Sequence, residues 1–177
     1  MKRMIFTILL AASGLFAANL SVEKGVVKAH TEVFGDSTID PETRGLTSRL
    51  TMAGMPETIQ GSVDISMTVL KSDNAKRDEH MMEAIEADRF PRATYTFEKV
   101  TKKRGDGYVV EGVLTFHGVK RPLKIDARIF NGARTLSFAG HSSFNMSDYG
   151  VQPPKLLFLT VRDRIDLAID VTFKKER

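Results

Sequence analysis

Apolar and polar residues alternate with a period of two along most of the chain, the pattern of strands that bury one face and expose the other. Between positions 62 and 69, for example, Val63, Ile65 and Met67 alternate with Asp64 and Ser66. Similar runs cover 46–52, 94–98, 108–117, 123–129, 136–144 and 165–173, and a weaker run covers 25–33. The pattern therefore predicts about eight strands.

Turn signals between these runs indicate how the strands are connected. The segments 104–107 (RGDG) and 131–132 (NG) are short connections of the kind that joins antiparallel neighbours. Because each strand has one dry face, about eight of them can close into a barrel whose interior is filled or holds one small ligand. The sequence thus predicts an all-β fold, an antiparallel eight-stranded barrel. A sandwich of two sheets buries the same faces and stays open as the alternative.

One segment departs from the period of two. Over 74–88 (NAKRDEHMMEAIEAD), Met81, Met82 and Ile85 fall at helical spacing, and Ser72 or Asp73 offers an N-cap. A short helix is expected there, and the chain returns to extended structure at the following Phe-Pro pair, 90–91.

The first 17 residues have the pattern of a secretory signal peptide. Lys2 and Arg3 precede an apolar run over 4–10, and small residues lead to a cleavage site after Ala17 or Ala18. The apolar run is shorter than the roughly 20 residues of a spanning helix. We expect residues 1–17 to be removed on export to the periplasm, leaving 18–177 as one domain with no stable membrane span.

Composition excludes several kinds of chemistry. The chain has 177 residues and no cysteine, so disulfides, thiolate metal sites and cysteine nucleophiles are absent. Its four histidines show no metal-ligand spacing, and we expect neither a metal site nor a cofactor. Loss of Lys2 and Arg3 lowers the formal net charge from +4 to +2, which is too small an excess to indicate nucleic-acid binding.

A polar cluster stands near the start of the expected helix. Arg77, Asp78 and His80 place a guanidinium, a carboxylate and an imidazole close together in sequence. They would serve as a polar cap over a ligand, or, in an enzyme, Asp78 and His80 would act as acid and base. A structural network at the helix N-terminus is the simpler interpretation. No nucleophile elbow or phosphate-binding glycine loop accompanies them, so no enzyme activity is predicted.

Several motifs, in order along the chain, resemble the YceI-like family of lipocalin-like periplasmic proteins. They run from about position 61 to the end of the chain. They are 77–81 (RDEHM), 89–97 (RFPRATYTF), 112–125 (GVLTFHGVKRPLKI), 147–150 (SDYG) and 165–173 (IDLAIDVTF). The resemblance implies a barrel around an extended tunnel that binds an apolar lipid: a polyisoprenoid, an isoprenoid quinone or a fatty-acid-type molecule. It implies transport or storage of that lipid.

The resemblance also gives the inward-facing residues a role as tunnel lining. We expect the tunnel to be lined by Met52, Val63, Ile65, Met67, Tyr95, Phe97, Leu114, Phe116, Phe138 and Phe144. Asn145-Met146 replaces the basic residue that the family has before its Ser-Asp pair, so Arg77 and Arg162 become candidates to meet a polar head group. A filled core in a protein that acts through its surface in the envelope remains the alternative. The sequence also leaves open whether the chain forms a homodimer.

Overall fold

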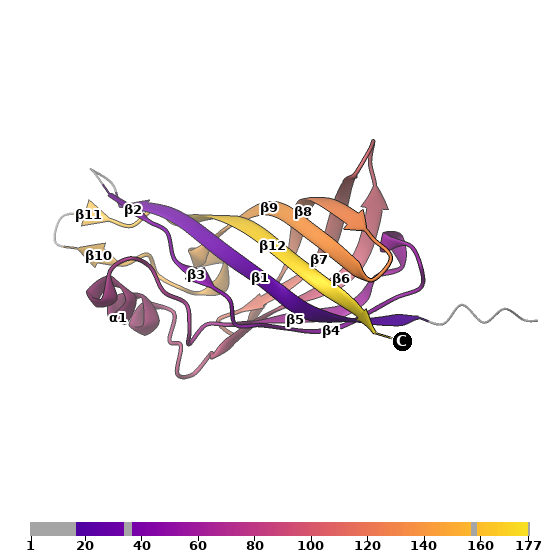
Figure 1. Cartoon of the computed structure of the whole chain (residues 1–177). Coiled ribbons are helices and arrows are strands. Elements are labelled where there is room, and N and C mark those ends of the chain that lie inside the picture. The colour runs from indigo at the N-terminus through magenta and orange to yellow at the C-terminus, as the bar shows by residue number, and fades with distance from the viewer. Residues whose placement is uncertain (1–16, 34–36, 157–158, 177) are drawn as a thin grey trace, which may run out of the picture.

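The computed structural model describes residues 17–33, 37–156 and 159–176. In it eight antiparallel strands close into a barrel, which is seen from the side in Figure 1. Around the barrel, β1 is followed by β12, β9, β8, β7, β6, β5 and β4, and β4 pairs with β1 again. The strands are β1 (Ala18–Val33), β4 (Leu46–Met52), β5 (Gln60–Ser66), β6 (Arg92–Lys102), β7 (Gly107–Phe116), β8 (Val119–Asn131), β9 (Thr135–Asn145) and β12 (Arg164–Glu176). The predicted antiparallel barrel is confirmed, and the sandwich is wrong.

Smaller elements gather at one end of the barrel. There β2 (Ser37–Ile39) and β3 (Glu42–Thr43) pair with β1, and β10 (Lys155–Leu156) pairs with β11 (Leu159–Thr160). The helix α1 (Ala75–Ala84) lies at the same end in Figure 1. Two short 3-10 helices, η1 (Pro56–Thr58) and η2 (Met146–Tyr149), complete the described elements.

The helix α1 is shorter than its sequence pattern predicts. Its N-cap is Asn74, whose side chain accepts a hydrogen bond from the Arg77 backbone N–H, so the expected caps at positions 72 and 73 are wrong. The helix ends at Ala84, and Glu86 then adopts a left-handed conformation with φ of 48°. That conformation turns the chain out of the helix two residues after its end.

Strand β1 begins earlier than predicted, and a β-bulge explains why its first part did not fit the sequence pattern. Its register against β12 shifts between Val22 and Lys24. Before the bulge Leu20 is buried, and after it the inward positions become odd-numbered, ending in Thr31 and Val33. An extra residue in one strand reverses the alternation, so the first half of β1 does not continue the pattern that reveals the second half.

The two halves of the barrel interior differ. In the half that holds the N-terminus of β1 and the C-terminus of β12, apolar side chains fill the space between the strands. Leu20, Leu50, Met52, Val110, Leu136, Val171 and Phe173 are all at least 97 % buried there. The other half, beside α1, contains a cavity.

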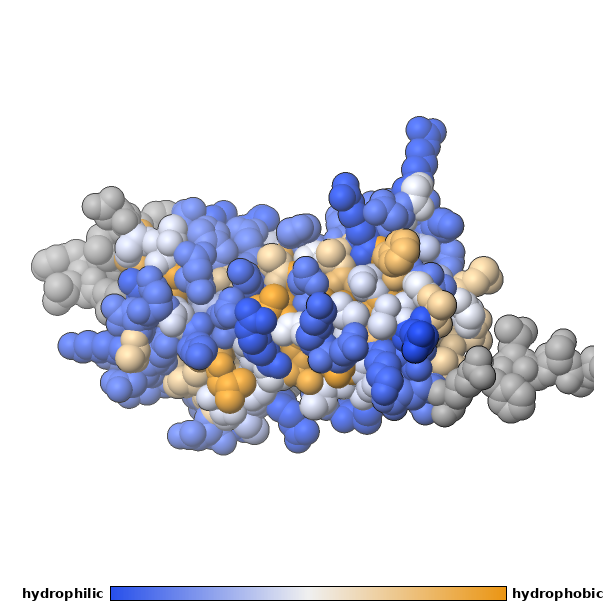
Figure 2. Space-filling model, viewed as in Figure 1, coloured by the Kyte–Doolittle hydropathy of each residue, from blue (hydrophilic) through white to orange (hydrophobic). Residues whose placement is uncertain are grey.

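The surface around this interior is mainly polar. Figure 2 shows charged and polar side chains over most of the face in view, with small hydrophobic patches between them. No helix in the described part of the chain is long and apolar enough to cross a membrane.

Candidate functional site: an apolar cavity in one half of the barrel

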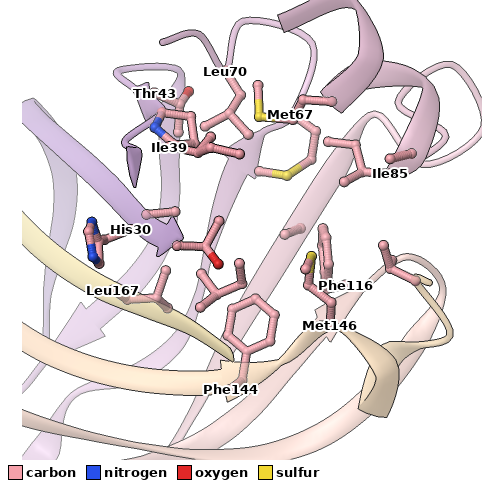
Figure 3. A pocket seen from close by; sticks show the side chains of 18 of the residues that line it. His30, Ile39, Thr43, Met67, Leu70, Ile85, Phe116, Phe144, Met146 and Leu167 are labelled. Atoms are coloured by element: carbon pink, nitrogen blue, oxygen red, sulfur yellow. The ribbon is translucent and has the colours of Figure 1, made fainter. Parts of the chain in front are cut away.

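The cavity has a volume of about 190 Å³ and is lined almost entirely by carbon and sulfur atoms. Its strand walls come from β1, β2, β3, β5, β6, β7, β9 and β12. In Figure 3, Met67, Leu70 and Ile39 face Phe144 and Leu167 across this space. Such a space is suited to a hydrocarbon group, because few polar atoms would lose their hydrogen bonds to water when it is occupied.

One wall of the cavity is aromatic. Phe116 on β7 and Phe144 on β9 pack edge to face, with ring centroids 5.7 Å apart. Tyr149 of η2 packs against both rings, 5.7 Å from Phe116 and 5.1 Å from Phe144, and is itself 1 % exposed. Edge-to-face packing fixes the three rings relative to one another, so this wall is held in place by the fold itself.

The helix α1 covers the cavity without being part of the core. Met81 and Ala84 line the space, as does Ile85 just after the helix. No residue of α1 is fully buried, and only Ile85, at its C-cap, is 7 % exposed. The helix therefore forms a roof over the cavity and has no fully buried residue of its own.

A histidine fixes the end of this roof. The Nε2 atom of His117 lies 3.1 Å from the Glu86 carboxylate, and its Nδ1 atom lies 3.1 Å from the backbone carbonyl of Tyr149. His117 is in the β7–β8 turn, where it adopts a left-handed conformation with φ of 48°. Phe90 packs on the imidazole with ring centroids 4.4 Å apart. These contacts link the chain after α1 to the barrel rim.

The ten residues expected to line a tunnel divide into two groups. Five line the cavity: Ile65, Met67, Leu114, Phe116 and Phe144. The other five lie outside it, among side chains of the filled half: Met52, Val63, Tyr95, Phe97 and Phe138. All ten belong to the apolar interior, and the division follows their position along the barrel.

The four expected polar cap residues are also separated. Arg77 and His80 lie in the cavity lining. Asp78 does not, because its carboxylate accepts hydrogen bonds from the backbone N–H and hydroxyl of Ser72, at 2.8 and 2.7 Å. Arg162 also lies outside the lining, with its guanidinium 3.6 Å from the Glu32 carboxylate. Asp78 and His80 therefore do not converge on the cavity as an acid and base pair would.

The rim carries a histidine that the sequence pattern did not single out. His30, at the edge of the lining, places Nδ1 2.6 Å from the Asp40 carboxylate. The hydrogen bond that the His30 ring donates to the Asp40 carboxylate raises the pKa of His30 and lowers the pKa of Asp40. The nearby Arg77 guanidinium donates to the Thr38 carbonyl at 3.0 Å. The segment carrying β2 and β3 is thus tied to both β1 and α1 beside the cavity.

Comparisons with known proteins place the whole barrel in one family. A family model described as "YceI-like domain" matches residues 21–173. A UPF0312 protein of Shewanella baltica is 30 % identical over 108 residues, and one of Vibrio cholerae is 31 % identical over 98 residues. These alignments cover 56 % and 51 % of this chain, and 56 % and 52 % of the relatives. The chain thus spans about half the length of the curated relatives that it matches.

Solved structures share the fold at low sequence identity. Burkholderia cenocepacia BcnA superimposes with a TM-score of 0.74 and 14 % identity, over 84 % of this chain and 95 % of that one. A polyisoprenoid binding domain from Saccharophagus degradans gives 0.73 and 12 %, over 89 % and 99 %. The Campylobacter jejuni YCEI protein gives 0.69 and 19 %, over 81 % and 89 %. With the match over 21–173, these likenesses lead to one conclusion: the chain belongs to the family of YceI-like domain proteins.

Proposed function

We propose that this protein binds the apolar part of a lipid in the cavity and carries or stores that lipid in the periplasm. The observation that carries the proposal is the apolar cavity itself, which is lined by the barrel strands and roofed by α1. The YceI-like domain is a binding-protein fold, and the structural neighbour from Saccharophagus degradans is described as a polyisoprenoid binding domain, which supports a ligand of this class.

The rim suggests where the polar end of the ligand lies. Arg77 and His80 come from α1 and His30 comes from β1, so three basic side chains border the cavity. A carboxylate or hydroxyl group placed among them would keep hydrogen bonds while the hydrocarbon chain is buried. Fatty acids have a carboxylate and prenyl alcohols a hydroxyl at this end, and the ring carbonyls of a quinone could accept hydrogen bonds from the same side chains.

Burial of the chain provides the binding free energy. Removing apolar surface from water contributes about 25 cal/mol per Å², so each buried methylene adds roughly 0.8 kcal/mol. Binding of this kind requires no chemical step, and the proposed role is that of a carrier and not an enzyme.

The proposal is tested by native mass spectrometry of protein purified without detergent, followed by organic extraction and mass analysis of the released molecule. An apolar adduct of one molecule per chain is expected. If the protein shows only its own mass and takes up neither fatty acids nor prenyl alcohols on incubation, the proposal is wrong, and a role of the protein surface would replace it.

A variant on the roof connects the adduct to the cavity. Met81→Asp places a carboxylate in the lining, and we expect the adduct to fall at least about tenfold, because a hydrocarbon chain packed there would remove water from the new charge. The barrel should stay folded, since no residue of α1 is part of the buried core. Ala75→Asp adds the same charge to the exposed start of α1 and is expected to leave the adduct unchanged. An adduct retained in full by Met81→Asp would place the ligand elsewhere.

A further inference from the structure

We propose that two hydrogen bonds of the His117 ring hold the roof over the cavity in mildly acidic solution and release it as the pH rises toward 8, so that exchange of the lipid depends on pH. The two contacts, which we call the His117 bridge, join the chain after α1 to η2 through the β7–β8 turn. This inference names a control on the proposed lipid-binding cavity, and its lipid part rests on that proposed function.

The two nitrogen atoms of the His117 ring both face atoms that only accept hydrogen bonds. Nδ1 lies 3.1 Å from the Tyr149 backbone carbonyl, and Nε2 lies 3.1 Å from the Glu86 carboxylate. Neither a carbonyl oxygen nor an ionised carboxylate has a hydrogen to donate, so each nitrogen must carry one. A neutral imidazole has a single N–H, and a ring with two is positively charged. The complete His117 bridge therefore requires the charged imidazolium form.

The Glu86 carboxylate stays an acceptor in mildly acidic solution. Its Oε1 atom faces His117, and its Oε2 atom accepts a hydrogen bond from the Arg89 guanidinium. The Arg89 hydrogen bond, together with that of His117, lowers the pKa of Glu86. The shared hydrogen of the bridge therefore belongs to the ring and not to the carboxylate.

The His117 ring is held in place by its turn and its neighbours. His117 and Gly118 have successive φ values of 48° and 74°, the pair of left-handed conformations that a tight hairpin turn requires. Phe90 packs on the imidazole with ring centroids 4.4 Å apart, and a Cβ atom at position 118 would lie 2.8 Å from the Phe90 ring. The His117 side chain is 12 % exposed. This packing leaves the ring little room to find other partners when it loses a proton.

Loss of one proton breaks the bridge on one of its two sides. If Nδ1 keeps its hydrogen, the lone pair of Nε2 faces Glu86, and the roof loses its hydrogen bond to the barrel. If Nε2 keeps its hydrogen, the lone pair of Nδ1 faces the Tyr149 carbonyl, and η2 loses the bond instead. Ile85, next to Glu86, and Met146 of η2 both line the cavity (Figure 3), so either loss loosens the boundary of the cavity.

No second side chain supports the roof at this end. Within the described part of the chain, the contact between Glu86 and His117 is the one side-chain hydrogen bond that joins residues 85–90 to the barrel. At the other end of α1, Arg77 donates to the Thr38 carbonyl at 3.0 Å, a bond that involves no histidine. The roof should therefore open at the end that carries Glu86.

The charge change is assigned to the His117 ring because of the groups around it. Histidine is the side chain that ordinarily changes its charge between pH 5 and 8. The other ionisable groups beside the bridge come from the chain after α1, from η2 and from β8, and they are Arg89, Asp148, Tyr149 and Arg121. Side chains of these types ordinarily keep their charge over that range.

Amide hydrogen exchange in α1 tests the bridge without a ligand. With each rate divided by the intrinsic rate at the same pH, α1 should open about tenfold more often at pH 8 than at pH 5, because a charge-assisted hydrogen bond that solvent partly screens is lost. Exchange in β12, corrected in the same way, should not change. Equal protection of α1 at the two pH values would overturn the proposal.

Glu86→Gln separates the proton from the contact itself. A carboxamide accepts a hydrogen bond from a charged ring and donates one to a neutral ring, so this variant keeps the bridge in both states. Its α1 should be equally protected at pH 5 and 8, and better protected than the wild type at pH 8. Arg89→Gln removes the other partner of Glu86 and should keep the wild-type pH dependence. A Glu86→Gln protein that also keeps it would overturn the role of the His117 proton.

Two more histidines border the cavity, and each has its own control. His30 pairs with Asp40 at 2.6 Å, and His80 lies on α1 itself. Asp40→Asn removes the partner of His30, and His80→Gln removes the imidazole of the helix. In both variants the pH dependence of α1 exchange should persist. Its loss in either one would assign the effect to that histidine and overturn the role of His117.

Nitrogen NMR of the His117 ring observes the proton directly. Both ring nitrogens should carry hydrogen at pH 5, and one of them should carry hydrogen at pH 8. A ring that has the same number of hydrogens at the two pH values would contradict the proposal.

Release of farnesol connects the bridge to the cavity. Its hydroxyl does not titrate between pH 5 and 8, so the probe itself is constant. Its dissociation rate should be about tenfold higher at pH 8 than at pH 5 in the wild type, and equal at the two pH values in Glu86→Gln. A constant rate in a wild-type protein whose α1 exchange does change would overturn control of the lipid. If neither farnesol nor palmitate binds at either pH, the proposed function fails, and α1 exchange alone decides the bridge.

Discussion

Among single residues, His30 places a side chain that can carry a positive charge at the rim of the cavity. It stands where β1 meets the segment with β2 and β3, and its side chain pairs with Asp40 on that segment. The side chain is 39 % exposed, so solvent screens the pair and its contribution to overall stability is small. Its effect is local: it holds the segment that borders the cavity.

The pair should be strongest in mildly acidic solution. The folded-state pKa of His30 is above 6.5. The stability that His30 gains from the pair is therefore fully present below pH 6.5 and is lost as the pH rises through the raised pKa. The folded-state pKa of Asp40 is below 3.8. The stability that Asp40 gains from the pair is therefore present above pH 3.8 and is lost as the pH falls through the lowered pKa. Between these limits both groups are charged and paired.

An NMR titration of the His30 ring checks this assignment. We expect a pKa above 6.5 in the wild-type protein and a lower one in Asp40→Asn, because the main cause of the rise is removed. Asp106→Asn, in the β6–β7 turn at the far end of the barrel, should leave the His30 titration as it was. An identical His30 pKa in Asp40→Asn and wild type would mean that the pair does not form in solution.

Among the elements, the stability of α1 depends on contacts at its two ends more than on packing of its side chains. Asn74 caps the first turn, with its side-chain oxygen 3.1 Å from the Arg77 backbone nitrogen. Asp78 holds the preceding segment through Ser72, and Glu86 is held by His117 after the helix. A helix of ten residues with no buried side chain is marginal by itself, so these terminal contacts keep the roof in place.

Removal of the cap should therefore loosen the roof alone. Asn74→Ala is expected to destabilise α1 by about 1 kcal/mol, which makes its amide hydrogens exchange about fivefold faster. Exchange in the barrel strands and the midpoint of global unfolding should not change. Lys76→Ala removes an exposed side chain of the same helix and serves as the control. Equal acceleration in α1 and in β12 would contradict a roof that opens separately from the barrel.

The sequence predicted the strands well because alternation reports directly which face of a strand is dry. The prediction of strand positions failed where the alternation of apolar and polar residues reverses inside a strand. The bulge after Val22 hid the first part of β1, and a second register shift between Phe97 and Lys99 moves the buried position of β6 to Val100. Long-range pairing fixes such bulges, and no local pattern shows them.

The site was predicted only in part for a different physical reason. Alternation places Leu114 and Tyr95 alike on the inward face, and both are inward. Whether the space beside each is open depends on how far neighbouring side chains reach across the barrel, as the Tyr95 ring does over Gly112. That reach is a property of the closed barrel, so the sequence alone could not divide the ten expected lining residues into two groups.

In the whole molecule, the expected signal peptide precedes a strand that helps to close the barrel. Residues 1–16 lie outside the described part of the chain, and β1 starts at Ala18, one residue after the end of the expected signal. Its first residues, Ala18 to Leu20, are the ones that pair with β4. Cleavage after Ala17 would keep all of these pairs, and cleavage after Ala18 would remove the first.

The intact mass of protein recovered from the periplasmic fraction tests this expectation. We expect a chain that begins at Ala18 or Asn19, and the loss of Lys2 and Arg3 with the signal should lower the formal net charge to +2. Replacing both basic residues with Glu should retain the protein in the cytoplasm at its full mass. A periplasmic protein that still begins at Met1 would show that the segment is not removed.

The two halves of the barrel interior differ in what their side chains do, because one half is filled and the other contains the cavity. The half packed with Leu20, Leu136 and Phe173 leaves no space for a ligand, while the lining of the other half borders the cavity and is largely buried as well. Substitutions in that lining should therefore change ligand affinity, while substitutions in the filled half act on folding alone. A barrel built this way can diverge in what it binds while its scaffold stays the same, and its cavity is a favourable starting point for engineering new small-molecule receptors.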